Sequence, residues 1–186
     1  MATHVIYKLG PFTVPAFAGE RHVRVYLPSE QPEGDPLPVL YIFDGQNIFH
    51  DDPSAAGGWY LHHAAHDLHA EGKLAPVIVG IDHGGADRIH ELSPFPFEDS
   101  RGDADHLIDW LVDELVPRIH RQFPVRRDVA GTAIGGSSMG GLAALYTHYR
   151  RPDIFGAALC MSPSLWVADR RGALARSATR SVLVHE

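Results

Sequence analysis

Apolar residues occur along this chain in blocks whose length and spacing distinguish strands from helices. Residues 21–27 alternate polar and apolar side chains and end at Pro28, a pattern typical of a half-buried strand near a sheet edge. Continuous apolar runs of six or seven residues predict strands that are covered on both faces. These runs span residues 38–43, 75–81, 129–134 and 155–161, and residues 181–184 open one more strand.

Three segments predict helices. Residues 59–71 repeat their apolar positions with a helical spacing. A second helix is expected after Asp103, a candidate N-cap, with a bend at Pro117. Its apolar side chains recur every four residues, at Leu107, Leu111, Leu115, Ile119 and Phe123. A third helix is expected to end near Arg150. Strands that alternate with helices predict an α/β fold with a mostly parallel sheet flanked by helices.

The third helix follows a glycine-rich turn, in which residues 136–140 read Gly-Ser-Ser-Met-Gly. This segment fits the G-x-S-x-G motif. Ser138 is in register, because a motif centred on Ser137 would need glycine where Met139 stands. Such a turn holds the serine in a strained conformation, and the helix N-terminus beneath it favours negative charge. Ser138 is therefore the candidate nucleophile, and the alternative is a serine that caps a plain strand-to-helix turn.

Composition and charge exclude several classes of partner. A net charge of −7 and an isoelectric point near 6.0 argue against a nucleic-acid or anionic membrane surface, which select clustered lysine and arginine. The first ten residues lack a signal-peptide pattern, and no apolar run approaches a membrane span, so we expect a cytoplasmic protein. The single cysteine, Cys160, lies in an apolar run and is expected to be a buried, inert thiol.

Residues 41–47, 80–94, 135–141 and 161–166 resemble, in this order, four motifs of the putative esterase family of α/β-hydrolases. The family includes enterochelin esterases, feruloyl esterases, S-formylglutathione hydrolases and mycolyltransferases. The resemblance implies a single α/β-hydrolase domain over residues 1–186. It also implies a serine esterase that hydrolyses a small-molecule ester through an acyl-enzyme, without a metal or an organic cofactor. The alternatives are an inactive scaffold that binds a ligand or partner in the same cleft, and an acyltransferase.

An acyl-transfer site needs hydrogen-bond donors aimed at the oxyanion. In this fold the residue after the nucleophile supplies one backbone N–H, which is that of Met139. The resemblance implies a second N–H from Gln46, although its loop also fits a simple tight turn. The resemblance further places Arg88 and Glu91 beside the substrate entrance, where they would either fix a loop or meet a polar substrate, with a surface ion pair as the alternative. Trp166 follows a strand end at the same cleft, and we expect it either to line an acyl or aryl pocket or to pack in the core.

The catalytic base is the part that the sequence does not supply. The triad of this fold runs along the chain as Ser, then Asp or Glu, then His. His148 lies ten residues along the elbow helix, about 15 Å from the nucleophile, and His185 is the last histidine. We therefore expect the acid and the histidine beyond Glu186. The chain would then be C-terminally truncated, a poor catalyst alone, and prone to homo-oligomerise through an unpaired sheet edge. A rewired base would come from His50 or His83.

Three histidines share one face of the first predicted helix, at spacings of i, i+4 and i+7: His62, His66 and His69. This spacing suits a zinc site. The helix has no HExxH motif, however, and metal sites usually recruit further ligands from elsewhere in the chain. We therefore expect a solvated histidine-rich face and no metal.

Overall fold

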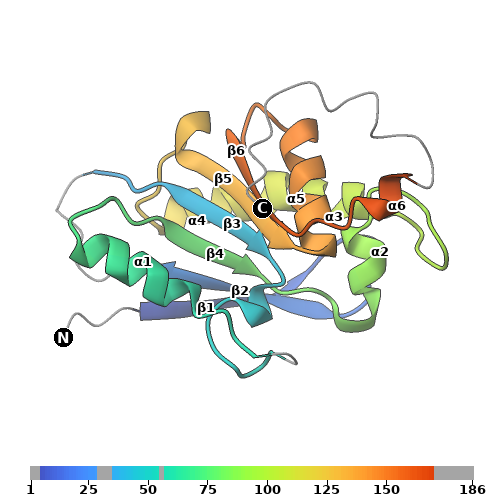
Figure 1. Ribbon diagram of the computed structural model, residues 1–186, viewed down its shortest axis with the longest axis horizontal. Coiled ribbons are helices and arrows are strands. Elements are labelled where there is room, and N and C mark those ends of the chain that lie inside the picture. The colour runs from blue at the N-terminus through green and yellow to red at the C-terminus, as the bar shows by residue number, and fades with distance from the viewer. Residues whose placement is uncertain (1–4, 29–34, 55–56, 170–186) are drawn as a thin grey trace.

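A computed structural model describes residues 5–28, 35–54 and 57–169. In this part of the chain six strands form one sheet, in the order β1-β2-β4-β3-β5-β6 (Figure 1). β2 is antiparallel to both of its neighbours, whereas β4, β3, β5 and β6 are parallel. The strands are β1 (Val5–Thr13), β2 (Glu20–Leu27), β3 (Val39–Phe43), β4 (Val77–Ile81), β5 (Thr132–Ser137) and β6 (Ala157–Met161).

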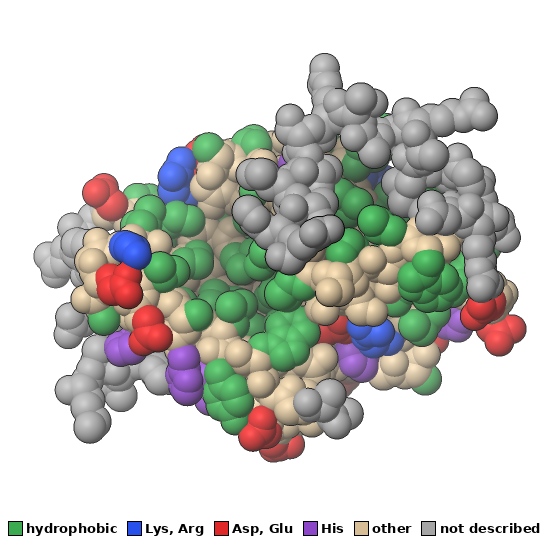
Figure 2. Space-filling view, in the orientation of Figure 1, with side chains coloured by type: hydrophobic (Ala, Val, Ile, Leu, Met, Phe, Trp, Pro, Cys, Tyr) green, Lys and Arg blue, Asp and Glu red, His purple; other side chains and the backbone are tan. Residues whose placement is uncertain are grey.

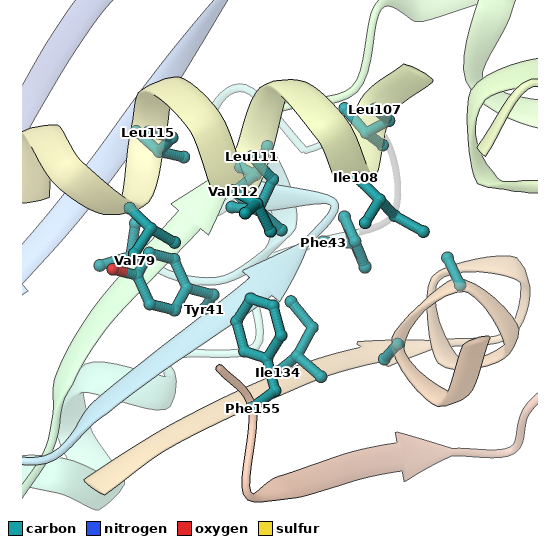
Figure 3. Close-up of a cluster of buried hydrophobic side chains, with 14 of the residues drawn as sticks. Tyr41, Phe43, Val79, Leu107, Ile108, Leu111, Val112, Leu115, Ile134 and Phe155 are labelled. Carbon is teal, nitrogen blue, oxygen red and sulfur yellow. The ribbon is translucent and has the colours of Figure 1, made fainter. Parts of the chain in front are cut away.

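Helices cover both faces of this sheet. The helices are α1 (Leu61–Ala70), α2 (Arg88–Leu92), α3 (Ala104–Trp110), the π-helix η3 (Leu111–Leu115), α4 (Val116–Gln122), α5 (Met139–Arg150) and α6 (Trp166–Asp169). Short 3-10 turns are η1 (Gly45–Asn47), η2 (Gly85–Asp87) and η4 (Val129–Gly131). α3, η3, α4 and α5 share a core with one face of the sheet, and α1 packs against the other (Figures 1 and 3). None of the helices in the described ranges is long and apolar enough to cross a membrane.

The strand order places a topological switch point at the carboxyl ends of β3 and β5. The chain leaves β3 through α1 and returns to β4 on one side, then passes back over β3 to reach β5 on the other side. Right-handed crossovers that run in opposite directions put their helices on opposite faces of the sheet. Open α/β sheets bind their ligands at such a switch point.

Most predicted strands and helices are confirmed, with ends that shift by one to three residues. The interior strands match the apolar runs, and α5 ends at Arg150 as predicted. β5 begins at Thr132 rather than Val129, because the first three residues of that run form η4. The sequence analysis missed β1, an edge strand whose residues are mostly exposed and therefore carry no continuous apolar run. The strand predicted at residues 181–184 lies outside the described residues.

The long helix after Asp103 widens in its middle. A four-residue repeat drifts by about 40° per step around an α-helix of 3.6 residues per turn. The wider turns of the π-helix η3 reverse this drift, which keeps the repeated side chains over the sheet (Figure 3). The irregularity expected at Pro117 thus takes the form of a π-helix just before it. Asp103 is the N-cap residue of α3 as predicted, but its side chain makes no capping hydrogen bond, because its carboxylate accepts from Arg101 Nε at 2.7 Å.

Beside α1, hydrophobic side chains show over the middle of one molecular face, with charged side chains at its rim (Figure 2). Leu159 of β6 is one exposed apolar residue, with 44% of its surface accessible among the described residues. Single exposed apolar side chains are ordinary on protein surfaces. The segments after β3, β4, β5 and β6, rather than this face, carry the residues singled out for the active site.

Candidate active site

Ser138 stands between the end of β5 and the start of α5. Its backbone has φ 55° and ψ −118°, a conformation that non-glycine residues rarely adopt and that stores roughly 1–3 kcal/mol of strain. Ser138 is exposed, whereas Ser137 ends β5 and is half-buried. The turn has no room at its first glycine, because a Cβ on Gly136 would overlap the backbone of Gly140. The predicted sharp elbow is confirmed, and the nucleophilic role of Ser138 stays a prediction.

Hydrogen bonds from the loop after β6 hold the elbow. The backbone N–H of Ser138 donates to the carbonyl oxygen of Met161 at 3.0 Å, and the Ser138 carbonyl accepts from the N–H of Ser164 at 3.0 Å. The two hydroxyl oxygens, Ser138 Oγ and Ser164 Oγ, lie 3.2 Å apart. The sequence analysis did not single out Ser164. The signal that could have found it was its place in the 161–166 motif.

The two predicted oxyanion donors lie at the same end of the sheet. η1 and the start of α5 follow the neighbouring parallel strands β3 and β5. A Cβ on Gly140 would come within 3.0 Å of Asp44 Oδ2, so the two segments nearly touch. The N–H of Met139 belongs to the first turn of α5, where N–H groups have no acceptor within the helix. Gln46 is the central residue of η1, and its Oε1 accepts the N–H of His83 at 3.1 Å. Their role in holding an oxyanion stays a prediction.

A partly buried ion pair fixes the loop after β3. Asp44 has a left-handed backbone with φ 61°, and its carboxylate accepts two hydrogen bonds from Arg88, from Nε and Nη2, each at 2.7 Å. These bonds raise the pKa of Arg88, so its guanidinium stays charged. The partner of Arg88 is thus Asp44, and the suggested surface pair with Glu91 is wrong. About a quarter of the Arg88 side chain, 27%, remains exposed to solvent.

Glu91 has no exposed surface, so the predicted substrate contact and the surface-pair alternative are wrong, and its contacts fit the predicted role of fixing a loop. Its Oε2 accepts from Arg21 Nη1 at 2.7 Å, and its Oε1 accepts from the N–H of Gly84 at 2.8 Å. Arg21 comes from β2 and is equally buried. The sequence analysis took Arg21 for the polar side of a half-buried strand. The pair instead ties the loop after β4 to the body of the sheet.

Trp166 begins α6, immediately after the loop that holds the elbow. Its side chain packs edge-on against Phe97, with ring centroids 5.6 Å apart. The tryptophan is nevertheless 48% exposed, which excludes the core-packing alternative for it within the described residues. Leu165 beside it is also exposed. Together they present an apolar surface near Ser138, and a pocket-lining role for Trp166 stays a prediction.

The histidines considered as bases are engaged elsewhere. In the part of the chain that the structure describes, the Ser138 hydroxyl is paired with that of Ser164. His83 Nδ1 accepts a backbone N–H at 3.0 Å, and burial lowers the pKa of this ring. His148 Nδ1–H donates to a backbone carbonyl at 2.8 Å, on the elbow helix. His50 stacks against aromatic rings beside α1. His185 lies outside the described residues.

Two features outside the candidate active site were also predicted from the sequence: the histidine-rich helix face and the inert thiol of Cys160. The predicted solvated histidine face is wrong for His62, which is fully buried and packs its ring against Phe49 and Tyr26. Among residues 5–28, 35–54 and 57–169, no group of three histidine, cysteine or acidic residues is arranged to hold a metal ion. Cys160 is only partly buried, and this burial raises the pKa of its thiol, which keeps it protonated.

Comparison with known proteins identifies the family of this chain. The model of the family described as "Putative esterase" matches residues 15–182. The siderophore triacetylfusarinine C esterase of Aspergillus fumigatus is 30% identical over 140 residues, which are 70% of this chain and 45% of that protein. The iron(III) enterobactin esterase of Dickeya dadantii is 32% identical over 153 residues, which are 79% of this chain and 31% of that protein. The chain thus spans half or less of the length of these two curated relatives.

Among solved structures, the BES protein from Bacillus cereus matches with a TM-score of 0.71 at 20% identity, covering 90% of this chain and 64% of that one. At this identity the likeness shows the fold, which agrees with the α/β-hydrolase fold that the family resemblance implied. Because the family model matches nearly the whole sequence, the chain belongs to the putative esterase family of α/β-hydrolases.

Proposed function

We propose that the protein hydrolyses a carboxylic ester through an acyl-enzyme on Ser138. The observation that carries this proposal is the exposed serine in a strained elbow at the N-terminus of α5. Ser138 Oγ bonds to the carbonyl carbon, and its proton passes through a general base to the departing alcohol as the ester C–O bond breaks. Water then attacks the acyl-enzyme and releases the acid and the free serine.

The oxyanion of each tetrahedral intermediate would be held by the backbone N–H groups of Met139 and Gln46. Electrostatics support this placement. The nearby Asp44 carboxylate would by itself disfavour a second negative charge, but its two-pronged bond to Arg88 neutralises it. The start of α5 adds the partial positive charge of a helix N-terminus. We assign the general base to a residue outside the described ranges, because His83 and the other described candidates are engaged elsewhere.

The substrate class follows from the relatives and from the surface beside the elbow. The relatives named above act on siderophore esters, as their names state. In this chain the exposed face of Trp166 lies near the nucleophile and can stack on a flat ring, such as an aromatic acyl group. We therefore propose a small-molecule ester of the siderophore type, with Trp166 and Arg88 at the entrance of the site.

The proposal predicts covalent labelling at one serine. The protein expressed from its complete open reading frame should react with a fluorophosphonate at Ser138 and not at Ser137, because only Ser138 projects from the elbow. Peptide mapping by mass spectrometry locates the adduct. A label on Ser137, or no label on either serine in a folded sample, would defeat the assignment of the nucleophile.

The oxyanion loop predicts a second result. Gln46→Pro removes the backbone N–H and should lower kcat for ester hydrolysis on the order of 10²-fold. Gln46→Ala keeps the backbone N–H and adds no charge, so it is the control and should retain most of the activity, although it removes the acceptor of the His83 N–H. Steady-state kinetics on folded variants decide the point. Equal losses in both variants would show that the amide side chain, rather than the backbone N–H, is what the reaction needs.

A further inference from the structure

We propose that Ser164 is a positioning residue for the nucleophile: its hydroxyl donates a hydrogen bond to Ser138 Oγ and holds that oxygen ready for attack. This inference rests on the proposed function of Ser138. The two oxygens lie 3.2 Å apart, within hydrogen-bond distance. Ser164 is only 6% exposed, whereas Ser138 is open to solvent. The bond therefore reaches the nucleophile from beneath and leaves its exposed side to the substrate and the base.

The loop that carries Ser164 does not need this hydroxyl to keep its place. Its backbone is already tied to the elbow by the bonds from Ser138 N–H to Met161 and from Ser164 N–H to the Ser138 carbonyl. The loop also packs closely against α5, because a Cβ on Gly141 would come within 3.2 Å of Pro163 Cα. An alanine at position 164 would preserve all of these contacts. The hydroxyl therefore contributes chiefly to the environment of Ser138 Oγ.

The charge that develops on Ser138 Oγ during the attack determines how the Ser164 hydrogen bond affects the rate. As Ser138 loses its proton, Oγ gains negative charge, and a hydrogen bond donated to it becomes stronger. An interaction that strengthens in the transition state speeds the chemical step without tightening substrate binding. Ser164 keeps its own proton throughout. Once the new bond to the acyl carbon has formed, Oγ is an ester oxygen and a weak acceptor.

The test measures how fast a fluorophosphonate labels Ser138, as the maximal rate constant kinact and the concentration constant KI, in the protein expressed from its complete open reading frame. Ser164→Ala should lower kinact about 10- to 100-fold, the size expected for one hydrogen bond to a charged oxygen. KI and the melting temperature should stay unchanged. Ser164→Thr keeps the hydroxyl and should restore most of the rate. Ser162→Ala is the matched control, since it removes an exposed hydroxyl from the same loop.

If the threonine methyl group does not fit, Ser164→Cys takes its place, and its weak S–H donor should give an intermediate kinact. A Ser164→Ala variant that reacts as fast as the unaltered protein would overturn the inference. So would parallel changes in kinact, KI and melting temperature that neither Ser164→Thr nor Ser164→Cys repairs, because these mark a purely structural role. In both cases Ser138 of the unaltered protein would still be labelled, and the proposed function would stand. Absence of that label would defeat both proposals.

Discussion

Gly136→Ala will destabilise the fold by about 3–5 kcal/mol and abolish the reactivity of Ser138. A methyl group on residue 136 would overlap the carbonyl of Gly140, where β5 and α5 cross at the elbow. The obstructing atoms are backbone, which cannot rotate away as a side chain can. Relief requires that α5 move off the strand, and this movement would release the strained conformation of Ser138. Urea unfolding followed by circular dichroism measures the loss of stability, and fluorophosphonate labelling measures the loss of reactivity.

Gly135→Ala is the matched control for this prediction. It adds the same methyl group one residue earlier in β5, where the nearest atoms are the Leu159 side chain and backbone at 3.3 Å. Those neighbours need to yield by only a few tenths of an ångström, so the loss of stability should be clearly smaller. Equal stability losses for Gly135→Ala and Gly136→Ala would contradict the close crossing of strand and helix at the elbow.

Glu91→Gln is expected to lower the free energy of unfolding by about 3–5 kcal/mol, because it leaves the Arg21 guanidinium buried without its carboxylate. Burial of an uncompensated charge is among the few mechanisms that give a single substitution so large an effect. The change also weakens the acceptor of the Gly84 N–H, so the loop that reaches Gln46 through His83 should loosen. Urea unfolding measures the first effect, and kcat for ester hydrolysis the second.

Asp153→Asn provides the comparison for this result. It removes the same charge from an exposed pair with Arg151, which solvent screens, so little change in stability is expected. The double variant Arg21→Met with Glu91→Leu is a further control, since replacing both partners by apolar side chains removes the unpaired charge. It should recover much of the stability that Glu91→Gln loses. If Glu91→Gln lowers the free energy of unfolding no more than Asp153→Asn does, the result would contradict the buried ion pair of Arg21 and Glu91.

The sequence predicted the parts of the fold whose signals are local. The elbow was predictable because its glycines, serine and flanking strand and helix all lie within about twenty residues. The buried strands were predictable because strands covered on both faces are continuous apolar runs. β1 was not, because an exposed edge strand needs no such run.

The supports of the candidate site were not predictable in the same way. Arg21 pairs with Glu91 across 70 residues, Asp44 with Arg88 across 44, and Ser138 with Ser164 across 26. These partners meet only because the sheet order brings β2, β3, β4 and β6 to one end of the molecule. A single sequence shows which residues are charged or polar, but it does not show which of them pair with each other. Glu91 was therefore misjudged as a substrate contact, although the resemblance had correctly drawn attention to its segment.

The same sheet order bears on how the molecule folds. The strained backbone of Ser138 is stabilised by β3 on one side of β5 and by the loop after β6 on the other. Contacts between segments so distant in sequence form slowly, because loop closure must precede the gain from pairing. The β1–β2 hairpin, by contrast, is local and can pair early. The conformation of Ser138 should therefore be among the last features to form, and substitutions at the elbow should speed unfolding more than they slow folding.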